Sequence, residues 1–302
     1  MKLRPPAFPL ITVDPYFSVW SHSDELYSSD TVHWTDDPNP LKGTVTVDGE
    51  TFRFMGMTKD PEIKQIYSDL SALVTDYVFE NDKIILHLSF YSTLFPNDLY
   101  RLSRPVSYLQ ITYDSNDGKS HDVFVDISAS EELCINKAGE TPVLAQGVEL
   151  CDSQKAIKIG SVYQKMLKRS GDVLRIEWGY FYLCGPSGAE YKSFEDEGKT
   201  FISTKFPLTE GKGSCLLFGY DDIKCLNYFG TNVDAYWKTK GLTIEEALVE
   251  AKNESDDMLK ECRRISEELF DEAENAGGEK YAELLSLAYR QLIAAHKLAV
   301  DT

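Results

Sequence analysis

The 302-residue sequence has few of the short motifs that mark catalytic sites. It contains no GxSxG nucleophile elbow, no SxxK pair and no CxxC motif, and its six cysteines lack the spacing of metal ligands. Histidine is also scarce: the five histidines are scattered, and none forms a persuasive pair with a cysteine nucleophile. The sequence therefore predicts no metal site and no cofactor, and it leaves the catalytic residues unidentified.

Positively charged residues are also few. The chain has 31 Lys and Arg residues against 49 Asp and Glu residues, which gives a net charge of −18. Because no basic stripe offsets this negative charge, it argues against nucleic acids and anionic membranes as binding partners. No apolar run approaches the roughly 18 residues that a membrane-spanning helix requires. We therefore expect neither a nucleic-acid partner nor a membrane partner.

The N-terminus shows no signal peptide, because Met1-Lys2-Leu3 leads directly into a proline-rich stretch. Two localisations stay open: the cytoplasm, or a secreted or periplasmic location if a leader was removed. The cysteines do not decide between them. Several lie inside apolar strand-like runs and are interpreted as buried free thiols, while one or two disulfides stay open for an oxidising compartment.

Residues 4–34 are, in contrast, rich in proline and aromatic side chains. Pro5, Pro6, Pro9 and Pro15 each remove a backbone donor and favour extended geometry in the residue before them. The apolar residues between them are too many for a disordered tail and too irregular for a helix. We expect this segment, the N-terminal ribbon (residues 4–34), to lie across another surface and to be held there by its side chains.

From residue 44 to about residue 228, short strand-like segments alternate with polar turns. The dipeptides at 48–49 and 81–82 and the polar run 115–118 each separate two apolar strands, and they predict three hairpins. So many short strands indicate a mainly β chain that folds as a large antiparallel β-sandwich.

Further along the chain, the apolar period changes from that of strands to that of helices. Thr243 and Glu246 form a capping box, after which a helix with one apolar face should run to Ala276. A second helix, from about Glu279 toward Val300, is apolar around nearly its whole circumference and should be buried. We expect its neighbours to lie in a helical domain outside this chain; the alternative is that it packs on the chain's own sandwich.

The predicted fold class is thus mainly β, with a large antiparallel β-sandwich followed by two C-terminal α-helices. Four segments are expected: an N-terminal proline- and aromatic-rich segment with the first hairpin (1–60), the β-sandwich (61–235), a linker helix (236–278) and the first helix of a truncated helical domain (279–302).

Blocks spread along the chain resemble the glutaminase A-like family of hydrolases. They are RPPAFPLITVDPYFSVWS, VHWT, PLKGTVTVDGETFRFMG, LSRPVSYLQITYDSNDGKSHDVFVDISAS, RSGDVLRIEWGYFYL and YAELLSLAYRQLIAAHKL. The resemblance implies a β-sandwich followed by an (α/α) toroid of paired helices, in which residues 281–298 would form the first helix. It also implies hydrolysis of L-glutamine to L-glutamate and ammonia, with the catalytic groups mainly in the toroid. Residues 1–302 alone are therefore expected to be inactive.

The loop of residues 21–40 is the first candidate for a binding surface. It holds His33, Trp34 and Asp36 between a buried aromatic run and the first hairpin. Polar groups beside an exposed Trp suit a substrate or interdomain contact. The alternative interpretation is that Trp34 anchors the N-terminal ribbon to the sandwich.

Arg290 and Gln291 form the second candidate, because they interrupt the otherwise apolar final helix, as His296 also does. Polar side chains on a buried helix need partners. The family architecture implies that these residues face the active-site cleft or the sandwich interface.

The remaining polar residues receive structural interpretations. His87 lies in an alternating strand and is assigned to the core or its rim, and His121 follows a turn and is expected to be solvated. Acidic neighbours such as Asp221 and Asp222 are interpreted as solvated loop carboxylates, because adjacent residues of a strand point to opposite faces.

Three functional classes stay open. The first is the sandwich portion of a glutaminase, whose partners are glutamine and the chain's own C-terminal helical domain. The second is a glycoside hydrolase or a related sugar-active enzyme, which convergent aromatic residues and a suitably spaced carboxylate pair would favour. The third is a non-catalytic module that binds a ligand or orients a partner domain.

Overall fold

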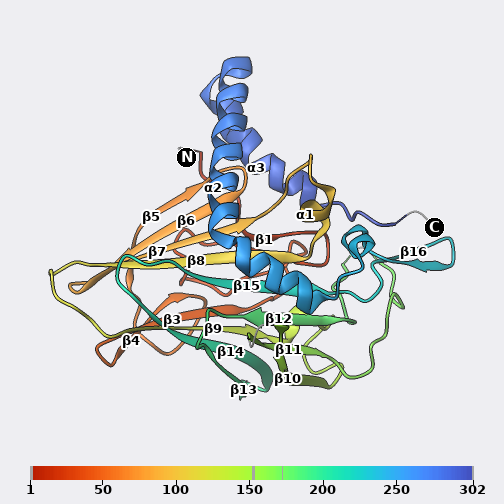
Figure 1. The fold of residues 1–302 in the computed structure, drawn as a ribbon, viewed down its shortest axis with the longest axis horizontal. Helices are drawn as coiled ribbons and strands as arrows, with labels where there is room; N and C mark the ends of the chain where they lie inside the picture. Colours follow the sequence, from red (N-terminus) through yellow and green to blue (C-terminus); the bar gives the residue numbers. More distant parts are fainter. Residues whose placement is uncertain (1–2, 152–153, 172, 301–302) are drawn as a thin grey trace.

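The computed structural model describes residues 3–151, 154–171 and 173–300. They form three stacked layers: a five-stranded sheet, an eight-stranded sheet and two C-terminal helices (Figure 1). Neighbouring strands in both large sheets pair antiparallel. The prediction of a mainly β chain with a large antiparallel sandwich and two C-terminal helices is confirmed.

The eight-stranded sheet has the order β10-β11-β12-β15-β8-β7-β6-β5. Its strands are Lys64–Leu70 (β5), Val74–Glu80 (β6), Ile84–Ser92 (β7), Val106–Ser115 (β8), Val143–Glu149 (β10), Lys155–Ser161 (β11), Tyr180–Cys184 (β12) and Ser214–Asp221 (β15). The five-stranded sheet, in the order β13-β14-β9-β3-β4, consists of Leu41–Val47 (β3), Glu50–Met55 (β4), Val123–Ser130 (β9), Glu190–Asp196 (β13) and Lys199–Leu208 (β14). Two small hairpins are formed by Phe8–Thr12 (β1) with Ser18–Ser21 (β2), and by Leu226–Tyr228 (β16) with Thr231–Val233 (β17).

The main core fills the space between the two sheets. Side chains alternate between the faces of each strand, so every second residue points inward. In β7, Leu86 and Leu88 are buried in this core, whereas His87 between them is on the other face. In β9, Val125 and Ile127 point into the same core. The register is therefore specified by burial, because a slip of one residue would expose the whole apolar row.

A second core lies on the outer face of the eight-stranded sheet, beneath α2 (Ile244–Gly277). Tyr91 and Tyr108 stack there with ring centroids 4.6 Å apart. Leu248 of α2 packs over Gly219 in β15, where a Cβ atom would lie 2.9 Å from the leucine Cδ2. The expected capping box is present at the start of this helix.

The last helix, α3 (Glu279–Ala294), packs along α2 and against β1 (Figure 1). It ends earlier than expected, and the segment that follows is extended and pairs with residues 234–236. Burial of α3 is one-sided, since Tyr281, Leu284 and Leu292 are 47%, 56% and 64% exposed. This face has no covering neighbour among the described residues, and the expectation that a helical domain outside this chain covers it stays a prediction. Among the helices within the described ranges, none is long and apolar enough to cross a membrane.

Two of the three expected hairpins are confirmed: the turns at 48–49 and 81–82 join β3 to β4 and β6 to β7. The third is wrong. Strand β8 pairs with β7 and β15, whereas β9 pairs with β3 and β14, so residues 116–122 carry the chain from one sheet to the other. Polar turn residues indicate a reversal but do not determine which strands pair. A short helix, α1 (Leu99–Ser103), connects β7 to β8 and is not predicted by the apolar pattern.

The N-terminal ribbon forms the β1–β2 hairpin and covers part of the inner face of the eight-stranded sheet. The rings of Phe8 and Tyr77 lie with their centroids 6.0 Å apart. The Thr75 hydroxyl donates to the Pro9 carbonyl at 2.7 Å. The ribbon therefore lies across another surface and is held by side chains, as expected.

Candidate functional site

A groove of about 370 Å³ opens between the N-terminal ribbon and the C-terminal end of α3. Trp34 and Gln291, two of the five predicted site residues, meet in this groove although they come from opposite ends of the chain. The lining residues are Ala7, Pro15, Ser18, Trp20, His22, Trp34, Gln291, Ala294 and Ala295. We call it the Trp34 groove.

Trp34 is fixed in place and still partly open to solvent. Its indole Nε1 donates to the Pro15 carbonyl at 2.7 Å, and the residue is 53% exposed. The internal hydrogen bond fits the anchoring interpretation, whereas the exposed ring fits a contact surface. Both properties belong to the same side chain.

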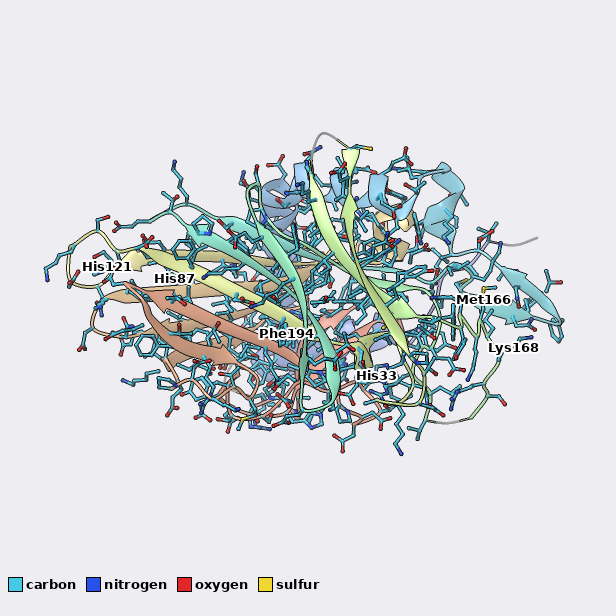
Figure 2. All side chains as sticks on the ribbon, turned by 90° about the horizontal axis from the view of Figure 1, so that it is seen from below. His33, His87, His121, Met166, Lys168 and Phe194 are labelled. Atoms are coloured by element: carbon cyan, nitrogen blue, oxygen red, sulfur yellow. The ribbon has the colours of Figure 1, made fainter. Side chains whose placement is uncertain are left out.

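His33 lies behind Trp34 and is fully buried. Its Nε2 is 2.9 Å from the same Pro15 carbonyl, which can only accept, so Nε2 carries the hydrogen. Burial lowers the pKa of His33 to about 4, and the imidazole is neutral at pH 7. His33 thus supports the turn beneath Trp34. In Figure 2 it lies well apart from His87 and His121.

Asp36 lies outside the groove, at the exposed edge of the loop, with a left-handed φ of 71°. Its Oδ1 is 3.3 Å from Nδ1 of His22. Since His22 lines the groove, the Asp36 carboxylate can orient an imidazole on the rim.

Trp20 forms a second aromatic wall of the groove. It is a site residue that was not predicted from the sequence. Its Nε1 donates to Ser18 Oγ at 2.6 Å, and the residue is only 6% exposed. The apolar pattern of the ribbon indicates burial for Trp20, and only the shape of the groove shows that part of the residue lines a cavity.

Arg290 faces away from the groove and is fully buried. Its guanidinium donates to the carbonyls of Ala72, Pro9 and Ser71 at 3.0, 3.1 and 3.0 Å. Burial lowers the pKa of Arg290 to about 9. The structure places this residue between α3, the ribbon and the β5–β6 turn. His296, in contrast, is exposed, and its Nδ1 lies 2.6 Å from the Leu292 carbonyl.

A buried ion cluster joins three distant segments beside this region. Lys297 Nζ contacts the carboxylates of Asp14, in the ribbon, and Asp222, after β15, the latter at 2.8 Å. Burial opposes the charge on Lys297, but the attraction of the two carboxylates outweighs it and raises the pKa of Lys297. The expectation that Asp222 is solvated is wrong, because the residue is 2% exposed. No spacing in the sequence could have indicated this cluster.

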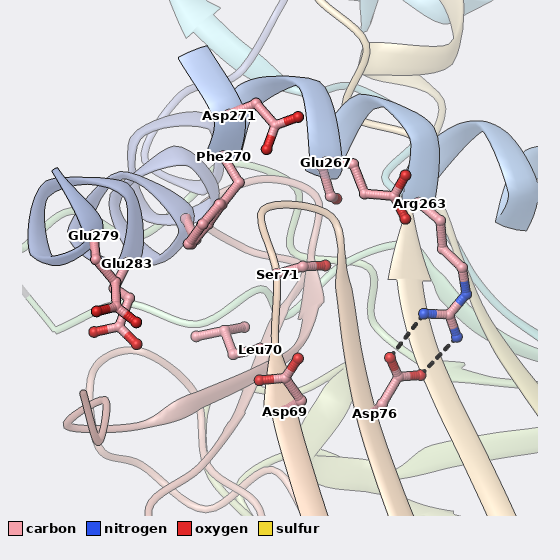
Figure 3. A pocket seen from close by; sticks show the side chains of 12 residues that line it. Asp69, Leu70, Ser71, Asp76, Arg263, Glu267, Phe270, Asp271, Glu279 and Glu283 are labelled. Carbon is pink, nitrogen blue, oxygen red and sulfur yellow. Dashed lines mark hydrogen bonds and ion pairs between the residues drawn. The ribbon is translucent and has the colours of Figure 1, made fainter. Parts of the chain in front are cut away.

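A larger and strongly acidic groove, of about 650 Å³, lies between the β5–β6 hairpin and the helices α2 and α3 (Figure 3). Its one described cationic lining residue, Arg263, binds both oxygens of Asp76 at 2.9 Å. The acidic lining residues are Asp69, Asp76, Glu267, Asp271, Glu279 and Glu283. The Leu3 amide donates to Glu283 at 3.3 Å. These carboxylates can attract cations but offer no thiol, hydroxyl–histidine pair or ring stack.

The thiols and the other histidines lie outside these grooves. All six cysteines are free, and Cys151 is exposed, so the expectation of burial is wrong for that residue. Burial raises the pKa of Cys184 to about 11 and of Cys262 to about 12.

The expectation that His121 is solvated is wrong. Its side chain is 5% exposed and lies between Asp48 and Asp117, 2.9 Å from each. In the part of the chain that the structure describes, no group of three or more potential ligands is placed to hold a metal ion.

Comparison with known proteins agrees with the resemblance in the sequence. A domain of unknown function (DUF4964) matches residues 1–67, and another domain of unknown function (DUF5127) matches residues 74–207. The curated protein Glutaminase A from Aspergillus oryzae (strain ATCC 42149 / RIB 40) is 25% identical over 345 residues, which cover 98% of this chain and 49% of that protein. The chain thus spans about half the length of the curated relative that it matches.

Two solved structures also match the chain. The "Putative kojibiose phosphorylase from human microbiome" has a TM-score of 0.47 and 9% identity, covering 94% of this chain and 39% of its own. The GH36 alpha-galactosidase AgaB from Geobacillus stearothermophilus has a TM-score of 0.38 and 10% identity, covering 73% and 41%.

The fold is that of an antiparallel β-sandwich protein whose residues 1–67 and 74–207 are similar to DUF4964 and DUF5127. More particularly, the chain is similar in sequence to Glutaminase A, in agreement with the sequence blocks.

Proposed function

We propose that this chain is the β-sandwich portion of a hydrolase that converts L-glutamine to L-glutamate and ammonia. The observation that carries the proposal is the similarity to Glutaminase A across 98% of the chain. The role of the sandwich is positional: it holds a helical domain that supplies the reacting groups, and residues 1–302 alone are inactive.

The state of the described side chains supports a positional role. The buried thiols Cys184 and Cys262 stay protonated at neutral pH, because their pKa values are raised to about 11 and 12, and a protonated thiol is a weak nucleophile. The neutral imidazole of His33 is engaged by Pro15 and Thr35 inside the protein. These groups stabilise the fold and are not presented to a substrate.

The exposed face of α3 supports docking of a helical domain. Tyr281, Leu284, Ala288 and Leu292 are all exposed and follow one another at intervals of three or four residues, which places them on one face. Contiguous exposed apolar residues are typical of an interaction surface. We propose that a toroid of paired helices covers this face, with α3 as its first helix.

Ammonia release from L-glutamine tests the proposed function. We expect turnover from a polypeptide that joins this chain to a helical domain of the glutaminase A type, and none from residues 1–302 alone. p-Nitrophenyl glycosides serve as comparison substrates, because a sugar-active enzyme is the second functional class. Turnover of glutamine by residues 1–302 would overturn the positional role. Glycoside hydrolysis without ammonia release would overturn the glutaminase activity.

A further inference from the structure

We propose that the Trp34 groove is a binding site for a neutral saccharide, with one pyranose ring seated against the indole of Trp34. The proposal concerns binding by residues 1–302 and does not depend on which bond the proposed hydrolase cleaves.

The two indoles of the groove offer ring faces and not hydrogen-bond donors. Trp34 Nε1 is bonded to the Pro15 carbonyl at 2.7 Å, and Trp20 Nε1 is bonded to Ser18 Oγ at 2.6 Å. An indole N–H is the only donor of a tryptophan side chain, so both donors are used internally. What Trp34 presents to solvent is therefore an apolar, polarisable surface whose orientation is set in advance.

A pyranose ring complements such a surface because one of its faces carries mainly C–H groups. Stacking of that face on a fixed indole removes apolar area from water and costs little side-chain entropy. The support beneath Trp34 is rigid, since buried His33 bonds to the same Pro15 carbonyl at 2.9 Å. The hydroxyl groups of the sugar would then point to the rim of the groove.

The rim carries neutral polar groups that suit hydroxyls. Gln291 contributes an exposed amide, which both donates and accepts. The Ser18 hydroxyl, in a residue that is only 1% exposed, accepts from Trp20 and belongs to the wall of the groove. His22 contributes an imidazole whose Nδ1 lies 3.3 Å from Asp36, so that its Nε2 edge is available.

Charge and size favour a neutral ligand over an amino acid. The groove is lined by no Lys or Arg among the described residues. The nearby guanidinium of Arg290 is turned away and donates to three carbonyls. The exposed guanidinium of Arg4, which donates to the His22 carbonyl at 3.1 Å, is paired with Asp24, so the carboxylate of glutamine would find here only a cation that already has an acidic partner. A volume of about 370 Å³ is at the small end of the range of roughly 300–1,000 Å³ that ligand sites occupy.

Calorimetric titration of residues 1–302 with D-glucose, D-galactose, maltose and L-glutamine tests the proposal. We expect saturable binding of at least one saccharide and none of glutamine. Trp34→Ala should weaken binding about tenfold, the order expected for one aromatic stacking contact. Trp34→Phe keeps a ring face and should retain most of the affinity. Phe229→Ala, which removes a 92% exposed aromatic ring outside the groove, should leave the affinity unchanged.

Gln291→Ala provides an independent variant, because it removes a rim group from the opposite wall without touching the ribbon. Circular dichroism of each variant shows whether the fold is retained. Absence of binding for all three saccharides, or equal saccharide affinity in the wild type and a folded Trp34→Ala variant, would overturn the proposal. Glutamine binding that Trp34→Ala abolishes would also overturn it while leaving the proposed glutaminase activity in place.

Discussion

Nη1 of Arg290 donates to the carbonyl of Pro9 at 3.1 Å, which ties the last helix directly to the first strand. The Pro9 carbonyl also accepts from the Thr75 hydroxyl, so β1, β6 and α3 meet at one oxygen. The N-terminal ribbon and α3 are thereby held in a defined relative position. The Trp34 groove lies between these same two elements and depends on that position.

Replacement of Arg290 should destabilise the chain. In Arg290→Met the carbonyls of Ser71 and Ala72 lose the donors that they now have, and unsatisfied buried acceptors are costly. We expect the free energy of unfolding to fall by about 2 kcal/mol or more, measured by urea denaturation. Arg264→Met is the matched control, since this exposed residue on α2 makes only surface ion pairs and should leave the midpoint of urea denaturation close to that of the wild type. Equal effects of the two variants on the free energy of unfolding would contradict the role of Arg290 as a donor to buried carbonyls.

Replacement of Lys297 alone should destabilise the chain more than simultaneous replacement of Lys297 and its acidic partner Asp222. Lys297→Met leaves the carboxylates of Asp14 and Asp222 buried without a cation, which typically costs about 3–5 kcal/mol. Adding Asp222→Asn to this variant should restore part of the loss, because one of the uncompensated charges is then gone. Thermal unfolding of both variants checks the prediction, and an additive double variant would refute the coupling.

Stability should depend on pH through His121. Hydrogen bonds to Asp48 and Asp117 raise the pKa of His121. The pKa of Asp117 is lowered chiefly by its hydrogen bond to His121, and that of Asp48 is lowered chiefly by the Asp122 amide and then by His121. The contribution of His121 is thus fully present below its unfolded pKa and is lost as the pH rises through the folded value. The carboxyls contribute above their unfolded pKa values, of about 4. The melting-temperature difference between wild type and His121→Gln should therefore be larger at about pH 5.5 than at about pH 9. Parallel pH curves for the two proteins would show that the cluster is not coupled to folding.

Gly219 should not tolerate a side chain. A Cβ atom there would lie 2.9 Å from Cδ2 of the fully buried Leu248, so Gly219→Ala should force this side chain to repack and cost about 1 kcal/mol. Gly147→Ala in β10 is the matched control, because a Cβ atom would meet nothing within 4 Å there. Urea denaturation of the two variants distinguishes them, and a neutral Gly219→Ala would mean that the helix has room to move.

The parts of this fold that could be predicted from the sequence are those formed by interactions between residues close together in the chain. The turn at 48–49 and the capping box of Thr243 and Glu246 are each formed within a few residues, and both are present. The crossing of residues 116–122 between sheets is not predictable in this way, because turn chemistry is the same whether the next strand pairs with the last or joins another sheet.

The candidate site shows the same division. Trp34 and Gln291 are each conspicuous among their neighbours in the sequence, and the groove brings them together. Arg290 is likewise conspicuous in the sequence, and its guanidinium donates to the carbonyls of Ser71 and Ala72 in the β5–β6 turn and does not line the groove. Lys297 is not conspicuous at all, and only the buried carboxylates around it make it distinctive.

The amino-acid sequence alone predicts a mainly β chain that resembles the glutaminase A-like family, with a proline-rich ribbon and two C-terminal helices. These features follow from side-chain periodicity, turn residues and ordered blocks, all of which act over short stretches of chain. That the ribbon and α3 enclose a groove is visible only in the tertiary structure, as is the face of α3 that stays exposed. The physical reason is that burial and hydrogen bonding between distant segments depend on how the sheets and helices pack, which no local pattern encodes.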